Sequence, residues 1–420
     1  MRVFKFGGAS INSVERINNL AAILKENNQT PLLVVISAMG KTTNALEKVV
    51  NAFYNKETEV ALSLFSDIKK QHVELATEIL NPNDANCHEH LNDFFTEVEW
   101  LLHDKPVREY DYYYDQIVSV GELMSTSIIA HFLNSKKINT HWFDVRDILR
   151  TDNNFRDAIV DWDETEKNIL KNISPLLKKN HIVLTQGYIG STTDNENTTL
   201  GREGSDFSAA IFANILNAEN VTIWKDVEAV MSADPKEFPD AYILAELSFE
   251  EVIEMAFYGA QVIHPKTIKP LQNKKIPLFV KCFLNPTLKG TIIHSVTGLK
   301  LPPIIVNKDH QVLISIKSKD FSFISGKPFS KLLHLLEDLK IKPNLIQTKA
   351  ISLEICLDDK PEKIEHLALM CSKDFDVTVE KNMSLLTIRH YNLEVFEKMT
   401  KGKEIILTQR TKENLQIIYK

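Results

Sequence analysis

Residues 2–10 read RVFKFGGAS, in which an apolar run ends at a pair of glycines. Asn12 and Glu15 form a capping-box pattern, which predicts a helix that continues to about Asn28. The next run, residues 31–37, is almost wholly apolar, as in strands buried on both faces of a parallel sheet. A strand, a glycine turn, a helix and a strand in this order predict an α/β fold.

The helical period dominates residues 41–134, with breaks near Asn81-Pro82-Asn83 and at Pro106, and predicts a helical insertion at the sheet edge. Strand patterns return at 139–143, 181–186 and 221–224, between helical patterns around 164–178 and 205–217. We therefore expect residues 1–303 to form one α/β domain, with three α/β/α layers.

A boundary is predicted at residues 295–303, where Gly298 and Pro302-Pro303 interrupt the pattern. The following segments predict β-α-β-β-α-β, the order of a ferredoxin-like sandwich: 312–317, 329–339, 344–348, 351–357, 362–371 and 376–380. A partial second copy is expected over 384–389, 393–399, 405–409 and 415–419. Residues 304–420 are thus expected to be an α+β region with one full and one partial repeat.

The composition is that of an ordinary soluble globular protein, with 420 residues, 44% hydrophobic and 25% charged. A formal net charge of -7 gives no overall basic field, so we expect no nucleic-acid partner. The four cysteines show no zinc-ligand spacing and are expected to be buried apolar residues. The N-terminus begins with a strand pattern, and we expect a cytoplasmic protein without a membrane segment.

The opening motif is a candidate phosphate site. Lys5, Gly7 and Gly8 lie at the carboxyl end of the first predicted strand, where open α/β sheets bind ligands. A Gly-Gly turn exposes backbone N–H groups, and a lysine supplies positive charge for a phosphoryl group. The alternative is a tight turn beside a solvated lysine. The motif is neither a Walker loop nor a dinucleotide fingerprint.

Hydroxyl and carboxylate side chains follow in two further segments. Ser37 to Asn44 end the second apolar strand, and could bind a substrate or simply cap a helix. Glu122 is a single carboxylate in the apolar and hydroxylic stretch SVGELMST, residues 119–126. The alternative to a substrate-binding role is that Glu122 lies on the solvent-exposed face of a helix, as single glutamates usually do.

A third group of candidates opens the predicted helix at residue 205. A helix N-terminus favours anions, and the Arg202 guanidinium matches a carboxylate bidentately. Asp206 either satisfies the helix dipole or orients a lysine at the phosphate. The strand end at IWKDV, residues 223–227, is followed by a turn of the kind that binds nucleotides. His264, before a proline, is interpreted as a helix cap rather than a base.

In this order the segments resemble the amino acid kinase family and, within it, the aspartokinases. The resemblance rests on six segments: KFGGAS, SVGELMST, LGREGSD, IWKDV, the tripeptide Ala233-Asp234-Pro235, and FYGAQVIHPKT. It implies transfer of phosphate from ATP, with Mg²⁺ bridging its phosphates and no dedicated protein metal cage, to the side chain of L-aspartate. The product would be 4-phospho-L-aspartate, the entry to lysine, threonine and methionine synthesis.

The resemblance also implies residue roles. The catalytic group would be Lys5, Gly8 and Asp206. Substrate would be held by Thr43, Glu122, Arg202 and Ser205, with Glu122 facing the ammonium. The nucleotide side would comprise Lys5, Gly7, Gly8, Ser37, Lys225, Asp226, Val230, Met231, Lys236 and Gln261. Two positions depart from the family pattern. Gln261 stands where the family usually has a lysine, and Lys225 stands where it more often has a threonine. We therefore expect Lys225 to restore the positive charge that is lost at position 261.

The tail resembles the paired ACT domains of aspartokinases, which implies a homodimer or higher homo-oligomer and an amino-acid effector. Lys342 and Lys349 flank the strand at which effector binding would begin, so we expect a weak response to lysine. Two alternatives stay open: another small-molecule kinase of the family, and a catalytically weak amino-acid sensor. No second dinucleotide-binding domain is expected.

Overall fold

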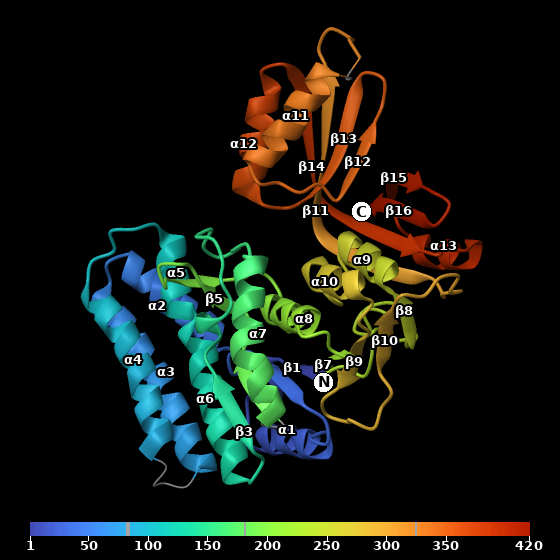
Figure 1. Cartoon of the computed structure of the whole chain (residues 1–420). Coiled ribbons are helices and arrows are strands. Elements are labelled where there is room, and N and C mark those ends of the chain that lie inside the picture. The colour runs from blue at the N-terminus through green and yellow to red at the C-terminus, as the bar shows by residue number, and fades with distance from the viewer. Residues whose placement is uncertain (81–84, 180–181, 324–325) are drawn as a thin grey trace. The chain divides into compact units, whose positions relative to one another are not determined.

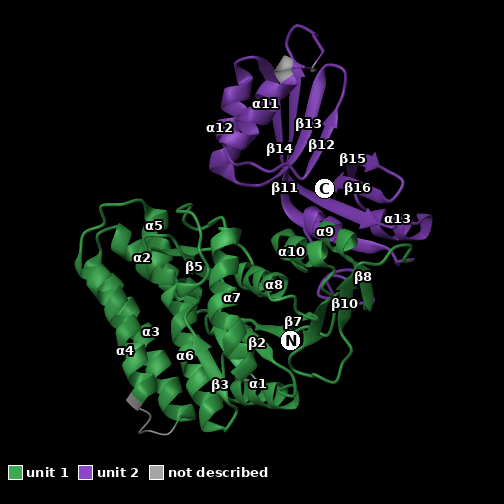
Figure 2. Ribbon diagram, in the orientation of Figure 1, with its two compact units in different colours: residues 1–230, 243–253, 261–299 green, residues 231–242, 254–260, 300–420 purple. Residues whose placement is uncertain are grey.

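The computed structural model describes residues 1–80, 85–179, 182–323 and 326–420 (Figure 1). The predicted break at 81–83 and the first residue of the strand predicted at 181–186 lie outside them. The chain divides into two units (Figure 2). The first comprises residues 1–230, 243–253 and 261–299, and the second comprises 231–242, 254–260 and 300–420. The chain passes from the first unit to the second for the last time between residues 299 and 300, within the predicted boundary. Two short segments of the predicted first domain, 231–242 and 254–260, belong to the second unit.

The first unit is built on an eight-stranded sheet of order β3-β4-β2-β1-β7-β9-β10-β8. Its strands are β1 (Arg2–Phe6), β2 (Leu32–Ile36), β3 (Thr140–Phe143), β4 (Ile182–Gln186), β7 (Val221–Lys225), β8 (Glu246–Ser248), β9 (Leu278–Cys282) and β10 (Thr291–His294). The strands from β3 to β9 in this order pair in parallel, and β10 is antiparallel to β9. Every residue of β2 is buried, as its apolar run predicts.

Helices pack on this sheet, which confirms the predicted α/β class. The helices of this part of the chain are α1 (Val14–Glu26), α2 (Thr42–Tyr54), α3 (Thr58–Ile79), α4 (Ala85–His103), α5 (Tyr110–Val118), α6 (Val120–Ser135), α7 (Trp162–Lys179), α8 (Gly204–Ile215), α9 (Phe249–Tyr258), whose last residues belong to the second unit, and α10 (Pro265–Lys274). The helix α8 packs on β1, β2 and β7 and contacts α7, whereas α6 packs on β2, β3 and β4 and contacts α3. The expected helical insertion corresponds to α2 to α6.

One local prediction needs correction. The cap of α1 is Ser13, whose Oγ accepts a hydrogen bond from the Arg16 N–H, and not Asn12. A two-stranded antiparallel ribbon, β5 (Ile189–Ser191) and β6 (Asn197–Thr199), precedes α8.

The second unit contains a six-stranded antiparallel sheet of order β12-β13-β11-β14-β16-β15. Its elements are β11 (Ile304–Ser318), α11 (Lys327–Asp338), β12 (Leu345–Thr348), β13 (Ser352–Asp358), α12 (Pro361–Ser372), β14 (Phe375–Arg389), α13 (Leu393–Thr400), β15 (Ile405–Arg410) and β16 (Asn414–Tyr419). The predicted ferredoxin-like order is present. The strands predicted at 376–380 and 384–389 are, however, one strand, and residues 304–308 of β11 pair with 385–389, adding an unpredicted strand to the second repeat.

The stretch Tyr110–Ser135, which contains α5 and α6, is long and apolar enough to cross a membrane by length and composition alone. In the fold, 89% of its apolar window is buried, so it is a core element of the first unit. The four cysteines are buried, as predicted, and none forms a disulfide among the described residues.

Candidate active site

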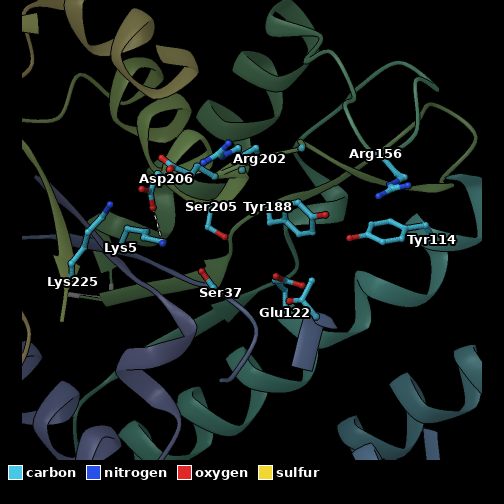
Figure 3. Close-up of a pocket in the computed structure, with 14 residues that line it drawn as sticks. Lys5, Ser37, Tyr114, Glu122, Arg156, Tyr188, Arg202, Ser205, Asp206 and Lys225 are labelled. Atoms are coloured by element: carbon cyan, nitrogen blue, oxygen red, sulfur yellow. Dashed lines mark ion pairs between the residues drawn. The ribbon is translucent and has the colours of Figure 1, made fainter. Parts of the chain in front are cut away.

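The carboxyl ends of β1, β2 and β7 and the start of α8 surround a cavity of about 540 Å³ (Figure 3). Open parallel sheets bind ligands at this edge. Eight residues singled out from the sequence line the cavity: Lys5, Ser37, Thr43, Glu122, Arg202, Ser205, Asp206 and Lys225. All belong to the first unit, so one cavity collects side chains from segments that are far apart in the chain.

Lys5 and Asp206 form an ion pair at the floor of this cavity. The Lys5 Nζ lies 2.7 Å from the Asp206 Oδ1, and the two side chains are only 12% and 3% exposed. Lys5 is on β1, and Asp206 is in the first turn of α8. A carboxylate in a first helical turn is favoured by the helix dipole, but this one also fixes the position of a lysine ammonium.

The paired glycines at the end of β1 serve two different purposes. A Cβ at Gly8 would lie 2.3 Å from the Ala38 carbonyl oxygen, so only glycine lets the ends of β1 and β2 approach this closely. A Cβ at Gly7 would lie 3.6 Å from the Lys5 Nζ, in space beside the ammonium. Neither glycine lines the cavity itself, but Gly7 leaves room for an anion next to Lys5.

Glu122 is a buried carboxylate with one unused oxygen. It lies on α6 and is 2% exposed. Its Oε1 accepts a hydrogen bond of 3.3 Å from the Ala38 N–H, while its buried Oε2 has no hydrogen-bond partner among the described residues. Burial raises the pKa of Glu122 to about 8, although the Ala38 N–H and Lys5 oppose the shift. Such an oxygen at a cavity wall suits an ammonium ligand.

Arg202 lies in the turn before α8. Gly201 (φ +76°) and Glu203 (φ +54°) are both left-handed, which turns the chain sharply around Arg202. Its side chain is exposed, and no ion pair or hydrogen bond occupies its guanidinium among the described residues. The Glu203 Oε2 accepts a hydrogen bond of 2.8 Å from the His264 N–H, which fastens the turn to the start of α10.

His264 caps α10, as predicted. Its Nδ1 accepts a hydrogen bond of 3.2 Å from the Lys266 N–H, and Pro265 follows at the first helical position. Burial lowers the pKa of His264, which favours the neutral ring that this cap needs.

The predicted nucleotide side is only partly assembled at the cavity. Lys225 lines it, and its Nζ donates a hydrogen bond of 2.6 Å to the Val262 carbonyl. Seven other predicted residues do not line it: Gly7, Gly8, Asp226, Val230, Met231, Lys236 and Gln261. Asp226 and Gln261 are exposed, because the turn after β7 and the start of residues 261–264 extend into solvent. Met231 and Lys236 belong to the second unit, and Val230 is buried.

Three cavity residues lie outside the sequence motifs: Tyr114, Arg156 and Tyr188. Arg156 (φ +69°) and Tyr188 (φ +71°) have left-handed backbones in connecting segments. Such turns carry no hydrophobic period, so no sequence signal located them; Tyr114 belongs to a helix that reads only as part of the insertion. The described residues contain no group of three or more metal-ligating side chains.

Comparisons with known proteins agree with this geometry. The model of the "Amino acid kinase family" matches residues 1–282. Over 359 residues the chain is 31% identical to lysine-sensitive aspartokinase 3 of Escherichia coli, covering 85% of this chain and 78% of that protein. It is also 34% identical over 297 residues to the chloroplastic bifunctional aspartokinase/homoserine dehydrogenase 2 of Arabidopsis thaliana.

That match covers 69% of this chain and 32% of the plant protein, so the chain spans about a third of the length of this bifunctional relative. Among solved structures, E. coli aspartokinase III in complex with aspartate and ADP superposes with a TM-score of 0.81. The sequence identity is 26%, and the superposition covers 100% of this chain and 96% of the other. The resemblance stated from the six sequence segments is thereby confirmed.

Proposed function

Because the chain belongs to the amino acid kinase family and, within it, to the aspartokinases, we propose that it transfers the γ-phosphoryl group of ATP to the side-chain carboxylate of L-aspartate. One observation carries the proposal. A single cavity combines three groups, from Glu122, Arg202 and Lys5: a buried carboxylate oxygen and a guanidinium that have no partner within the described part of the chain, and a lysine ammonium held by an ion pair. These groups complement the ammonium, the carboxylates and the phosphoryl group of the reactants.

The amino-acid half of the cavity recognises a free α-amino acid. The Glu122 Oε2 receives the substrate ammonium, which replaces the missing hydrogen bond of that oxygen. The Arg202 guanidinium binds the α-carboxylate bidentately, and the hydroxyl groups of Ser205 and Thr43 complete the site. An N-acetylated acceptor has no ammonium for Glu122, so it would leave a buried carboxylate unpaired.

The phosphoryl half depends on positioned charge. Lys5, held by Asp206, faces the group in transfer, and Lys225 adds a second cation at the same wall. The space beside Gly7 fits a phosphate oxygen, which supports ATP as the donor. Mg²⁺, when bound to the nucleotide, would neutralise charge on its phosphates. It would be carried by the phosphates, because the described residues offer no metal cage.

The reaction itself needs no general base. A side-chain carboxylate oxygen of aspartate attacks the γ-phosphorus, and the bond from that phosphorus to the bridging oxygen of ADP breaks. The nucleophile is already ionised at neutral pH, so the protein contributes positioning and charge stabilisation. The products are 4-phospho-L-aspartate and ADP, as at the entry to lysine, threonine and methionine synthesis.

The proposal is tested by ADP release with L-aspartate, L-glutamate and N-acetyl-L-glutamate as acceptors. We expect turnover with aspartate, and a loss of about 10²-fold or more in kcat/KM for aspartate in Arg202→Ala, because a bidentate charged contact is removed. Turnover with N-acetyl-L-glutamate instead would assign the chain to another branch of the family. No turnover with any acceptor would favour the sensor alternative.

The second unit supports a regulatory role in the same proposal. Its antiparallel ferredoxin-like sheet has the topology expected for paired ACT domains, and β12 and β15 are its two edge strands. We assign to it the binding of an amino-acid effector and a contribution to a homodimer or larger homo-oligomer.

A further inference from the structure

The far wall of the cavity contains a second arginine. Arg156 lines the same cavity as Lys5 and Lys225. Figure 3 shows Arg156 and Tyr114 on one side of the cavity and Lys5 and Lys225 on the other. Glu122 lies between these two groups in the view, so Arg156 stands beyond the residue assigned to the substrate ammonium.

The backbone of Arg156 is held by a buried carboxylate. Asp115 on α5 is completely buried, and one of its oxygens, Oδ2, accepts hydrogen bonds from the Arg156 N–H at 2.9 Å and the Thr199 N–H at 2.8 Å. Its Oδ1 accepts a third, of 2.7 Å, from the Thr199 hydroxyl. Asp115 thus joins α5 to the turn at Arg156 and to the last residue of β6, Thr199. Both contacts lead to an arginine of the cavity, because Arg202 follows three residues after Thr199. A left-handed φ of +69° costs energy for a residue with a side chain, so this contact fixes an otherwise disfavoured conformation.

The side chain of Arg156 is also fixed. Its guanidinium carbon lies 4.3 Å from the centroid of the Tyr114 ring, in a cation–π contact. Its Nη1 lies 3.1 Å from Asp111 Oδ1, and its Nη2 lies 3.9 Å from Glu47 Oε1. These partners hold the guanidinium against the ring at the cavity wall, whereas Arg202 has no such partner among the residues that the structure describes. The two arginines are therefore suited to different tasks.

We propose that Arg156 is a specificity-determining residue, which closes the amino-acid end of the cavity and restricts the acceptor to a four-carbon dicarboxylic amino acid. Asp115 is the positioning residue that places it. This inference rests on the proposed function. L-Glutamate has one methylene more than L-aspartate. With its side-chain carboxylate at Lys5, its α-carbon with the ammonium and α-carboxylate would lie about 1.5 Å closer to Tyr114 and Arg156. The substrate ammonium would then leave Glu122 and approach a guanidinium of like charge.

The test compares kcat/KM for L-glutamate with that for L-aspartate in wild type and in Arg156→Gly. Glycine adopts a left-handed backbone freely, so this variant removes the side chain without adding strain. One methylene is worth about 10–200-fold in discrimination, and we expect the glutamate-to-aspartate ratio to rise at least about tenfold, with an unchanged KM for ATP. Lys137→Gly is the matched control, because Lys137 is an exposed cation with a φ of +62° that does not line the cavity.

The role of Asp115 has its own pair of variants. In Asp115→Asn the amide oxygen can still accept hydrogen bonds from both backbone N–H groups, so we expect the wild-type ratio of kcat/KM for glutamate to that for aspartate. In Asp115→Ala we expect the ratio to shift as in Arg156→Gly, with a higher KM for aspartate and an unchanged KM for ATP. A purely structural role would lower kcat for both acceptors alike and leave the ratio unchanged.

The outcomes separate the inference from its premise. Aspartate turnover in wild type, together with a glutamate-to-aspartate ratio that stays within about twofold in Arg156→Gly, overturns the inference and leaves the proposed function intact. A wild-type protein without aspartate-dependent ADP release overturns the proposed function and the inference with it. An equal shift in Lys137→Gly also contradicts the inference.

Discussion

The Lys5 ammonium lies 2.7 Å from the Asp206 carboxylate, although one residue belongs to the first strand and the other to α8. The pair is almost entirely buried, and removing one partner would leave the other without its counter-charge. This relationship fixes the direction of the lysine at the cavity floor. It also joins β1 to α8, the helix that directly follows the turn that bears Arg202.

The ionisation of Glu122 predicts a pH dependence of catalysis. Burial raises the pKa of the free Glu122 carboxyl to about 8, and the proposed role requires the ionised form. We expect kcat/KM for aspartate to fall about tenfold for each pH unit below 8, because this parameter follows the free enzyme. In Glu122→Gln the value should be low and this dependence absent. A variant with the wild-type pH profile would rule out the assignment.

The same pKa predicts a change in stability that is independent of activity. The unfolded carboxyl ionises near its ordinary value of 4.5, but the folded one stays protonated up to about 8. The stability that the protonated Glu122 carboxyl contributes is therefore complete below pH 4.5 and is lost as the pH rises to 8. We expect the melting temperature of Glu122→Gln, relative to wild type, to increase between pH 5 and pH 8. A constant difference would contradict the assigned pKa.

The two glycines of the β1 turn should respond differently to alanine. Gly8→Ala must displace the Ala38 carbonyl, so we expect the free energy of unfolding to fall by about 1–3 kcal/mol. Gly7 has an ordinary extended backbone, with φ −79° and ψ 166°, so Gly7→Ala should fold normally but raise the KM for ATP. Chemical denaturation and steady-state kinetics separate the two effects. Equal destabilisation by both variants would argue against this division of roles.

Lys225 and Gln261 provide a matched pair at the nucleotide side. Lys225 lines the cavity, whereas Gln261 is exposed and does not. We expect Lys225→Ala to lower turnover by about 10²-fold, as for the loss of one preorganised donor, and Gln261→Ala to have little effect. Equal losses of turnover would show that Lys225 does not supply the charge that the family's usual lysine provides.

The second unit predicts a weak response to lysine. The Asn344 side chain is already occupied, because it accepts from Lys308 Nζ at 2.8 Å and donates to Gln311 and Asp358 at 2.7 Å. Lys349 forms an ion pair with Glu354, which partly offsets the like charge that an effector ammonium would meet. Isothermal titration with lysine and with threonine should give no micromolar binding of lysine. A micromolar dissociation constant for lysine would refute this expectation.

Sequence patterns located the residues that end or begin strongly patterned segments. Lys5 ends an apolar strand and Asp206 opens an alanine-rich helix, so each could be placed at the active edge of the sheet. Arg156 could not, because its position depends on a left-handed turn that Asp115 holds from α5. Long-range hydrogen bonds of this kind leave no periodic trace in a single sequence.

The limits of the strand predictions have a similar origin. Prediction began the first strand of the second unit at residue 312, because Lys308 to Gln311 are polar, yet β11 continues through an irregularity at His310 (φ +56°). Likewise, Asn382 (φ +59°) resembles a turn residue, but it lies inside β14. Polar residues with left-handed backbones can mark either a turn or a bulge, and only the pairing of neighbouring strands distinguishes them.

The most direct test of the central claim is the ATP-dependent formation of an acyl phosphate from L-aspartate, trapped with hydroxylamine and compared with ADP release. We predict that the wild type forms aspartyl hydroxamate in step with ADP. Lys5→Met and Asp206→Asn should each lose about 10²-fold or more in kcat, while Lys25→Ala, an exposed lysine of α1, should keep the wild-type rate. ADP release that does not depend on aspartate, or a wild-type rate in Lys5→Met, would contradict the claim.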